Sequence, residues 1–168
     1  MTKSKKSLLL TFGLILVIIV CLAFLRQYLQ QKEDQAESKG GVAYAEMVRD
    51  NDPLLVEFRQ RHPERTVLLA CSEDITNDGK RDLVVISQLD DANTTIALID
   101  DGNGGFIETE PVPAPKENQH IRFMNIDKLG AIETLITGEK NGQVGYAVYR
   151  IMDDRMVDLY RDGMEECC

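Results

Sequence analysis

Two adjacent cysteines at the end of this 168-residue sequence, Cys167 and Cys168, offer its most distinctive chemistry. A soft metal or metalloid displaces thiol protons and takes neighbouring sulfurs as ligands. Glu165 and Glu166 precede the pair, and their charge disfavours a thiolate, so ion capture is easier to support than unaided redox catalysis. We therefore expect residues 164–168 to bind a thiophilic ion or to exchange disulfides with a partner. The alternative is a frayed acidic end with two idle cysteines.

A third thiol, Cys71, stands at the end of an expected strand. Thiols outside the cytoplasm tend to be oxidised to disulfides. In one interpretation Cys71 forms a disulfide with one tail cysteine. In another the two tail cysteines form a disulfide with each other. The first interpretation makes Cys71 the resolving thiol of an oxidoreductase. The sequence has no zinc-type C-x-x-C with partners, no G-x-S-x-G and no phosphate-binding glycine loop. A thiol oxidoreductase is therefore the only enzymatic candidate, and His62 and His120 are expected in polar surface loops.

A second chemical feature is the oxygen-rich loop at residues 74–82, between two apolar segments. Oxygen ligands alternate along it, with Gly79 permitting a sharp turn. Calcium takes six to eight oxygens at about 2.3 to 2.6 Å, and this alternation suits such an ion. The loop is shorter than an EF-hand loop and lacks its closing Glu. The predicted ligands are Asp74, Thr76, Asp78, Lys80 through its carbonyl, and Asp82. The alternative is an Asp/Asn/Gly hairpin turn that binds no metal tightly.

This loop resembles that of FG-GAP and VCBS repeats, which reads D-x-[DN]-x-D-G-x-x-D and leads into an apolar strand. Thr76 stands where those families prefer Asn or Asp. The glycine-rich turn at residues 101–106 is also similar to a later turn of such repeats, so the resemblance covers about residues 67–106. It implies a β-repeat fold and a structural calcium ion.

A second copy of the loop frame occurs at residues 125–133, 51 positions after the first. Leu129 replaces the central Asp, and Lys128 adds a cation, so we expect this copy to turn the chain without binding metal. Two repeats are too few to close a propeller of about four to eight blades. A small sandwich or a pair of stacked blades is the expected arrangement.

An uncharged apolar stretch at residues 8–25 is expected to anchor this domain in a membrane. Eighteen helical residues span about 27 Å, close to the thickness of a bilayer core and longer than the core of a signal peptide. Three lysines precede the stretch and only Arg26 closely follows it, which predicts a cytoplasmic N-terminus at residues 1–7. A lipoprotein cleaved before Cys21 is the disfavoured alternative, because Val20 is not small. A stalk at residues 26–41 then leads to an extracytoplasmic domain at residues 42–163.

The charge of the exported part limits its partners. Residues 27–168 contain 15 basic and 28 acidic residues, a formal charge of −13. Such a surface repels nucleic acid and anionic lipid, and it attracts cations. Beyond the anchoring helix, metal ions therefore fit this composition better than nucleic acid does.

The periodicity of residues 42–163 predicts a mainly β domain preceded by short helices. Helical spacing covers residues 42–49. Asp52 and Pro53 give a cap and a first helical residue for a second helix that buries Leu54, Leu55 and Phe58. Seven strands are expected at residues 67–70, 83–87, 95–99, 121–124, 133–137, 146–152 and 156–160.

The whole plan resembles the Cys-Cys-COOH (seleno)protein family called SaoC, on the strength of Cys167 and Cys168 after an anchored domain of this size. Members of that family carry cysteine or selenocysteine there and are associated with an ABC transporter and a thioredoxin-like protein. The resemblance implies an accessory role in redox or metalloid handling beside a transporter. The alternative is a calcium-stabilised structural interaction module with no redox role.

Overall fold

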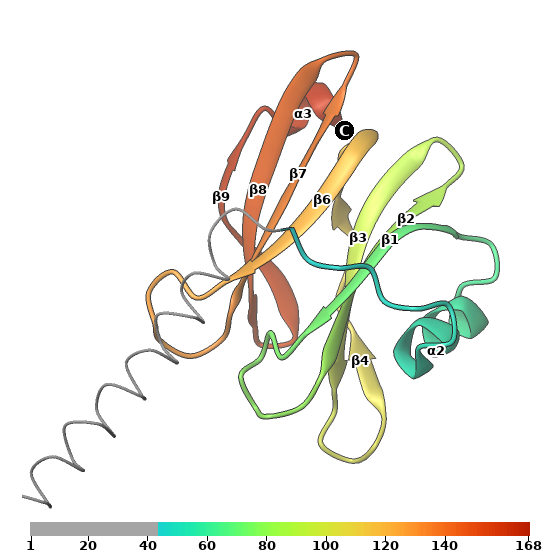
Figure 1. Cartoon of the computed structure of the whole chain (residues 1–168), viewed down its shortest axis with the longest axis vertical. Coiled ribbons are helices and arrows are strands. Elements are labelled where there is room, and N and C mark those ends of the chain that lie inside the picture. Colours follow the sequence, from blue (N-terminus) through green and yellow to red (C-terminus); the bar gives the residue numbers. More distant parts are fainter. Residues whose placement is uncertain (1–43) are drawn as a thin grey trace, which may run out of the picture. The chain divides into compact units, whose positions relative to one another are not determined.

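Nine strands and two short helices make up residues 44–168, the part of the chain that the computed structural model describes (Figure 1). The first antiparallel sheet contains β1 (Thr66–Glu73), β2 (Asp82–Leu89), β3 (Ala92–Asp100) and β4 (Phe106–Glu108), with β5 (Val112–Pro113) paired to β3. The second contains β6 (Glu117–Met124), β7 (Glu133–Lys140), β8 (Gln143–Met152) and β9 (Arg155–Asp162) in that order. The helices are α2 (Pro53–Arg61) and α3 (Met164–Cys167). The prediction of a mainly β fold is confirmed.

The predicted anchor at residues 8–25 and the stalk at 26–41 lie outside the described residues. Within residues 44–168, no helix is long and apolar enough to cross a bilayer. Residues 44–168 form one compact unit, which includes the acidic tail.

Helix α2 begins where the sequence predicts it. The Asp52 carboxylate accepts hydrogen bonds from the N–H groups of Leu54 and Leu55 at 3.0 and 3.4 Å, and Pro53 occupies the first turn. Leu55 and Phe58 are buried against one face of the first sheet. Because side chains alternate along a strand, Leu83 and other residues of β2 and β3 meet this helix while their neighbours face the second sheet.

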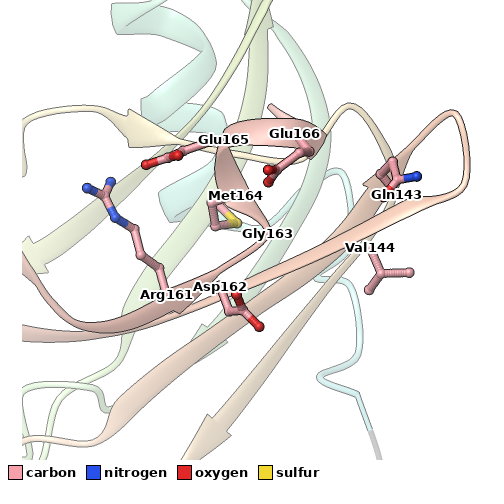
Figure 2. A pocket seen from close by; sticks show the side chains of 8 residues that line it. All are labelled: Gln143, Val144, Arg161, Asp162, Gly163, Met164, Glu165 and Glu166. Carbon is pink, nitrogen blue, oxygen red and sulfur yellow. The ribbon is translucent and has the colours of Figure 1, made fainter.

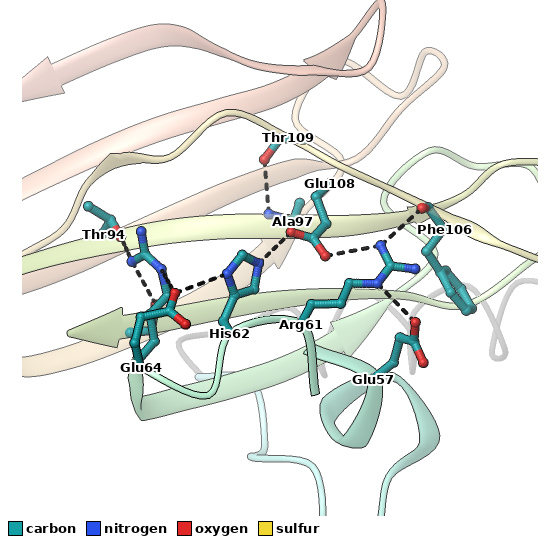
Figure 3. Close-up of polar contacts among 11 residues, drawn as sticks. Glu57, Arg61, His62, Glu64, Thr94, Ala97, Phe106, Glu108 and Thr109 are labelled. Carbon is teal, nitrogen blue, oxygen red and sulfur yellow. Dashed lines mark hydrogen bonds and ion pairs between the residues drawn. The ribbon is translucent and has the colours of Figure 1, made fainter. Parts of the chain in front are cut away.

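The C-terminal end of α2 is tied to β4 by a carboxylate between two basic groups (Figure 3). Glu108 accepts hydrogen bonds from Arg61 Nη1 at 3.0 Å and lies 2.6 Å from His62 Nε2. The imidazole also packs on Phe58, with ring centroids 4.8 Å apart. His62 is the partly buried residue that follows the helix, whereas His120 lies within β6, so the prediction of a loop position is wrong for His120.

A shared core joins the two sheets. The first sheet contributes Val84, Ile86 and Ile99, and the second contributes Ile121 and Ile136, all buried. Covering both faces of the first sheet, by α2 and by the second sheet, explains why β2 is an almost continuous run of buried residues.

Residues 44–48 connect the two sheets and are not helical. The N–H of Ala45 donates to Ile121 on β6 at 2.7 Å, Met47 pairs with Cys71 on β1, and the N–H of Val48 donates to Ala70 at 2.8 Å. The described part of the predicted helix at 42–49 is therefore wrong. Backbone hydrogen bonds to β1 and β6 satisfy this segment in place of a helical turn.

All seven predicted strands are present, and β4 and β5 are additional. These two have three and two residues, too few for an alternating pattern to show in the sequence. Strands β6, β7 and β8 begin at residues 117, 133 and 143, each 51 positions after β1, β2 and β3. The spacing noted between the two loops thus extends to the strands on either side of them.

Candidate functional site

The cysteine tail folds into a single turn on the second sheet. After β9 the chain reverses at Gly163, whose φ of 64° is left-handed and whose Cα lies where a side chain would meet the Val144 carbonyl. The N–H groups of Glu166 and Cys167 then donate to the Gly163 carbonyl at 3.3 and 3.2 Å, which closes the turn α3. The frayed end considered from the sequence is therefore not the arrangement found.

Three contacts fix this turn in place. The Lys116 N–H donates to the Cys167 carbonyl at 2.9 Å, and Lys140 Nζ donates to the Cys168 carbonyl at 3.3 Å. Gly145 on β8 lies so close beneath that a Cβ there would approach Cys167 Sγ to 2.4 Å. Only glycine permits this packing, so the sheet fixes the position of the first tail sulfur.

Three sulfurs meet on the turn. Cys167 Sγ lies 3.6 Å from Cys168 Sγ, and Met164 Sδ lies 3.8 Å from the former and 4.0 Å from the latter. We call these three atoms the sulfur triangle. Met164 and Cys167 are three residues apart, so one helical turn places both on the same buried face.

The two tail thiols differ in exposure, because Cys167 is fully buried and Cys168 is partly exposed. The amphipathic turn explains the difference, because Glu165 and Glu166 take the solvent side. Met164 was missed by sequence reasoning, since its relation to Cys167 appears only once the tail is helical.

Burial keeps the thiols of Cys168 and Cys71 protonated at neutral pH. Desolvation first, and then the neighbouring Cys167 thiol, raise the pKa of Cys168 to about 12, although Lys116 and Lys140 act in the opposite direction. Burial alone raises the pKa of Cys71 to about 11. The sequence predicted protonated thiols because of the adjacent glutamates, but for Cys168 the main cause is loss of solvent.

The Cys71 thiol makes its hydrogen bond to the backbone and not to the sulfur triangle. It is buried on β1, and its thiol donates to the Ala45 carbonyl at 3.6 Å. The sulfur contacts shown for residues 44–168 join Cys167 and Cys168 to each other and to Met164, and not to Cys71. The structure thus brings together two of the three predicted thiols.

The predicted calcium loop connects β1 to β2 as a hydrogen-bonded turn. Asp74 accepts from the N–H groups of Asp78 and Gly79 at 3.0 and 2.8 Å. Asp78 in turn accepts from the Lys80 N–H at 2.8 Å. These carboxylates point at donors within the loop, so the turn holds its shape through its own backbone.

The last predicted ligand, Asp82, is fully buried at the start of β2. Its carboxylate accepts from the N–H and hydroxyl of Thr76 at 3.1 and 3.2 Å and from the Asp100 N–H at 3.2 Å. Burial nevertheless raises its pKa. Residues 44–168 contain no group of three or more His, Cys, Asp or Glu side chains arranged to hold a metal. Calcium binding by this loop therefore stays a prediction.

The second loop receives a positive charge from Arg150 on the neighbouring strand β8. Glu133, 51 positions after Asp82, is likewise fully buried at the start of a strand. It accepts from the Ile126 N–H at 2.7 Å and forms an ion pair with Arg150, which also binds Asp127 at 2.6 Å. This pairing across β7 and β8 was not visible in the sequence, because Glu133 and Arg150 are distant along the chain.

A hollow of about 500 Å³ lies beside the tail (Figure 2). Asp162, Glu165 and Glu166 supply carboxylates to its lining, against one cation from Arg161. Met164 also lines it, beneath the turn of α3. The balance of charge around this hollow attracts cations toward the sulfur triangle.

No family model, curated protein or solved structure matches this chain. The resemblances drawn from the loop at 74–82 and from the terminal cysteines stay expectations.

Proposed function

We propose that this chain is a membrane-anchored extracytoplasmic accessory protein that binds a thiophilic metal or metalloid ion through Cys167 and Cys168. The observation that carries the proposal is the pair of free thiol sulfurs 3.6 Å apart on an ordered turn. Two sulfurs this close reach a single ion without rearrangement of the backbone. The protein holds and transfers the ion and does not turn over a substrate.

Binding exchanges protons for metal. As each metal–sulfur bond forms, one S–H bond breaks and its proton leaves to solvent. The high pKa of Cys168 opposes this exchange, so only an ion with strong affinity for sulfur completes it. The same protonation disfavours disulfide exchange, in which the thiolate is the attacking species. Ion capture is therefore preferred to the oxidoreductase alternative, including the version with Cys71 as resolving thiol.

The β domain serves as a rigid holder for the tail. Lys116 and Lys140 bind the last two carbonyls, and Gly145 lets Cys167 pack directly on β8. Preorganised ligands lose little freedom on binding, which favours affinity. In the SaoC-like role, the recipient of the ion is an ABC transporter component or a thioredoxin-like protein beside it.

The rival function is a structural interaction module in which calcium orders the FG-GAP/VCBS-like loop. One observation favours it: the buried Asp82 carboxylate receives its hydrogen bonds from uncharged donors, whereas the corresponding Glu133 is paired with Arg150. A cation at the first loop would supply the charge that Arg150 supplies at the second.

Titration of the reduced full-length chain in detergent with silver(I) and with arsenite tests the proposal. The wild type is expected to bind one equivalent of at least one of these ions, and Cys167→Ser/Cys168→Ser none. Cys71→Ala is the matched control, because it removes a buried thiol outside the tail. Equal uptake by the wild type and the double variant would refute the proposal.

A further inference from the structure

Building on this proposed function, we propose that Met164 is the third ligand of the tail and that the site is specific for copper(I). The sequence offers two tail sulfurs, and the fold adds a thioether from the first residue of α3. Met164 is buried and aims its sulfur at both thiols.

The dimensions of the sulfur triangle fit one metal ion. Its sides of 3.6, 3.8 and 4.0 Å place the point equidistant from the three sulfurs about 2.2 Å from each, against about 2.3 Å for a zinc–thiolate bond. An ion in the plane of the triangle would thus reach all three sulfurs with bonds of ordinary length. Little movement of Met164, Cys167 or Cys168 is needed.

The donor set selects the ion. Thiolates with a thioether suit copper(I), whereas protein zinc sites use cysteine, histidine and carboxylate and keep four ligands. A trivalent metalloid that forms three covalent bonds to sulfur would need three thiols, and this turn offers two. Binding of copper(I) releases two protons, from Cys167 and Cys168, and Met164 donates a lone pair without losing a proton.

The acidic hollow gives the ion a route to this site. Of the three sulfur-bearing residues, Met164 lines the hollow, and the two cysteines are absent from its lining (Figure 2). Asp162 and Glu166 place negative charge there. An incoming cation therefore meets the thioether first and reaches the thiols from it.

The test is competition for copper(I) between the reduced full-length chain and a chromophoric chelator, without oxygen. Met164→Leu should weaken copper(I) binding at least tenfold, and copper-edge X-ray absorption should count three sulfurs in the wild type and two in this variant. Met156→Leu is the matched control, since Met156 is a buried methionine of the same core outside the triangle. It should bind as the wild type does.

Three outcomes of these experiments would overturn different parts of the proposal. Equal affinity and equal sulfur counts for Met164→Leu and Met156→Leu, with binding still lost in Cys167→Ser/Cys168→Ser, would overturn the third ligand and leave the proposed function standing. Tighter uptake of zinc(II) or arsenite than of copper(I) would overturn the choice of ion. Unchanged copper(I) binding in the double cysteine variant would remove the proposed function as well.

Discussion

Gly145→Ala should displace the cysteine tail while all three sulfur-bearing residues remain in the chain. The added Cβ would lie 2.4 Å from Cys167 Sγ and 2.6 Å from the Gly163 carbonyl oxygen. Ordinary contacts between such atoms are about 3.5 to 4.0 Å, so the sulfur must move by about 1 Å or more. Metal–ligand distances tolerate only about 0.2 Å of error, and we therefore expect copper(I) affinity to fall about tenfold to a hundredfold.

The same overpacking should lower the free energy of unfolding by about 1–3 kcal/mol. Urea unfolding measures this loss, and chelator competition measures the affinity. Gly142→Ala is the control, because its φ of 78° makes alanine strained while nothing lies within 4 Å of the new Cβ. It should lose stability and keep its affinity. A Gly145→Ala protein with wild-type stability and wild-type affinity would refute the packing of α3 on β8.

Arg150→Met should lower the free energy of unfolding by about 3–5 kcal/mol, because it leaves the buried Glu133 carboxylate without its cation. A urea midpoint equal to that of the wild type would contradict this. Between pH 9 and 11, the stability should fall by about 2–3 kcal/mol through Cys71, whose pKa burial raises from 9.0 to about 11. The thiolate forms more readily in the unfolded chain, so this contribution is complete below pH 9 and lost as the pH approaches 11. Urea unfolding of Cys71→Ala should show a shallower dependence, and identical slopes would argue against it. Millimolar calcium should raise the melting temperature of the wild type and of the turn control Asp90→Asn, but not of Asp78→Asn. Absence of a shift in the wild type would count against the predicted loop ligands.

Local signals in the sequence were sufficient for much of the fold. Helix α2 follows from Asp52 and Pro53, which act within one turn, and the long strands follow from short apolar segments separated by turn-forming residues. Residues 44–48 show the limit of such signals. Their spacing is helical, but hydrogen bonds to β1 and β6 decide their conformation, and those partners are remote in the sequence.

Only part of the candidate site could be predicted from the sequence. Cys167 and Cys168 stand out by residue type and position, whereas Met164 becomes a candidate only when the tail forms a helical turn. The burial of Cys167 depends on Gly145, a residue on another strand that no local pattern connects to the tail. The local turn of α3 therefore brings in the third sulfur, and long-range packing determines the burial of the first thiol.

Native mass spectrometry of the full-length chain after exposure to one equivalent of copper(I) tests the central claim most directly. The wild type and Cys71→Ala should each gain one copper and lose two protons, as displacement of two thiol protons requires. Cys167→Ser/Cys168→Ser should gain none. Retention of one copper by that double variant, or no retention by the wild type, would contradict ion capture by the terminal cysteines.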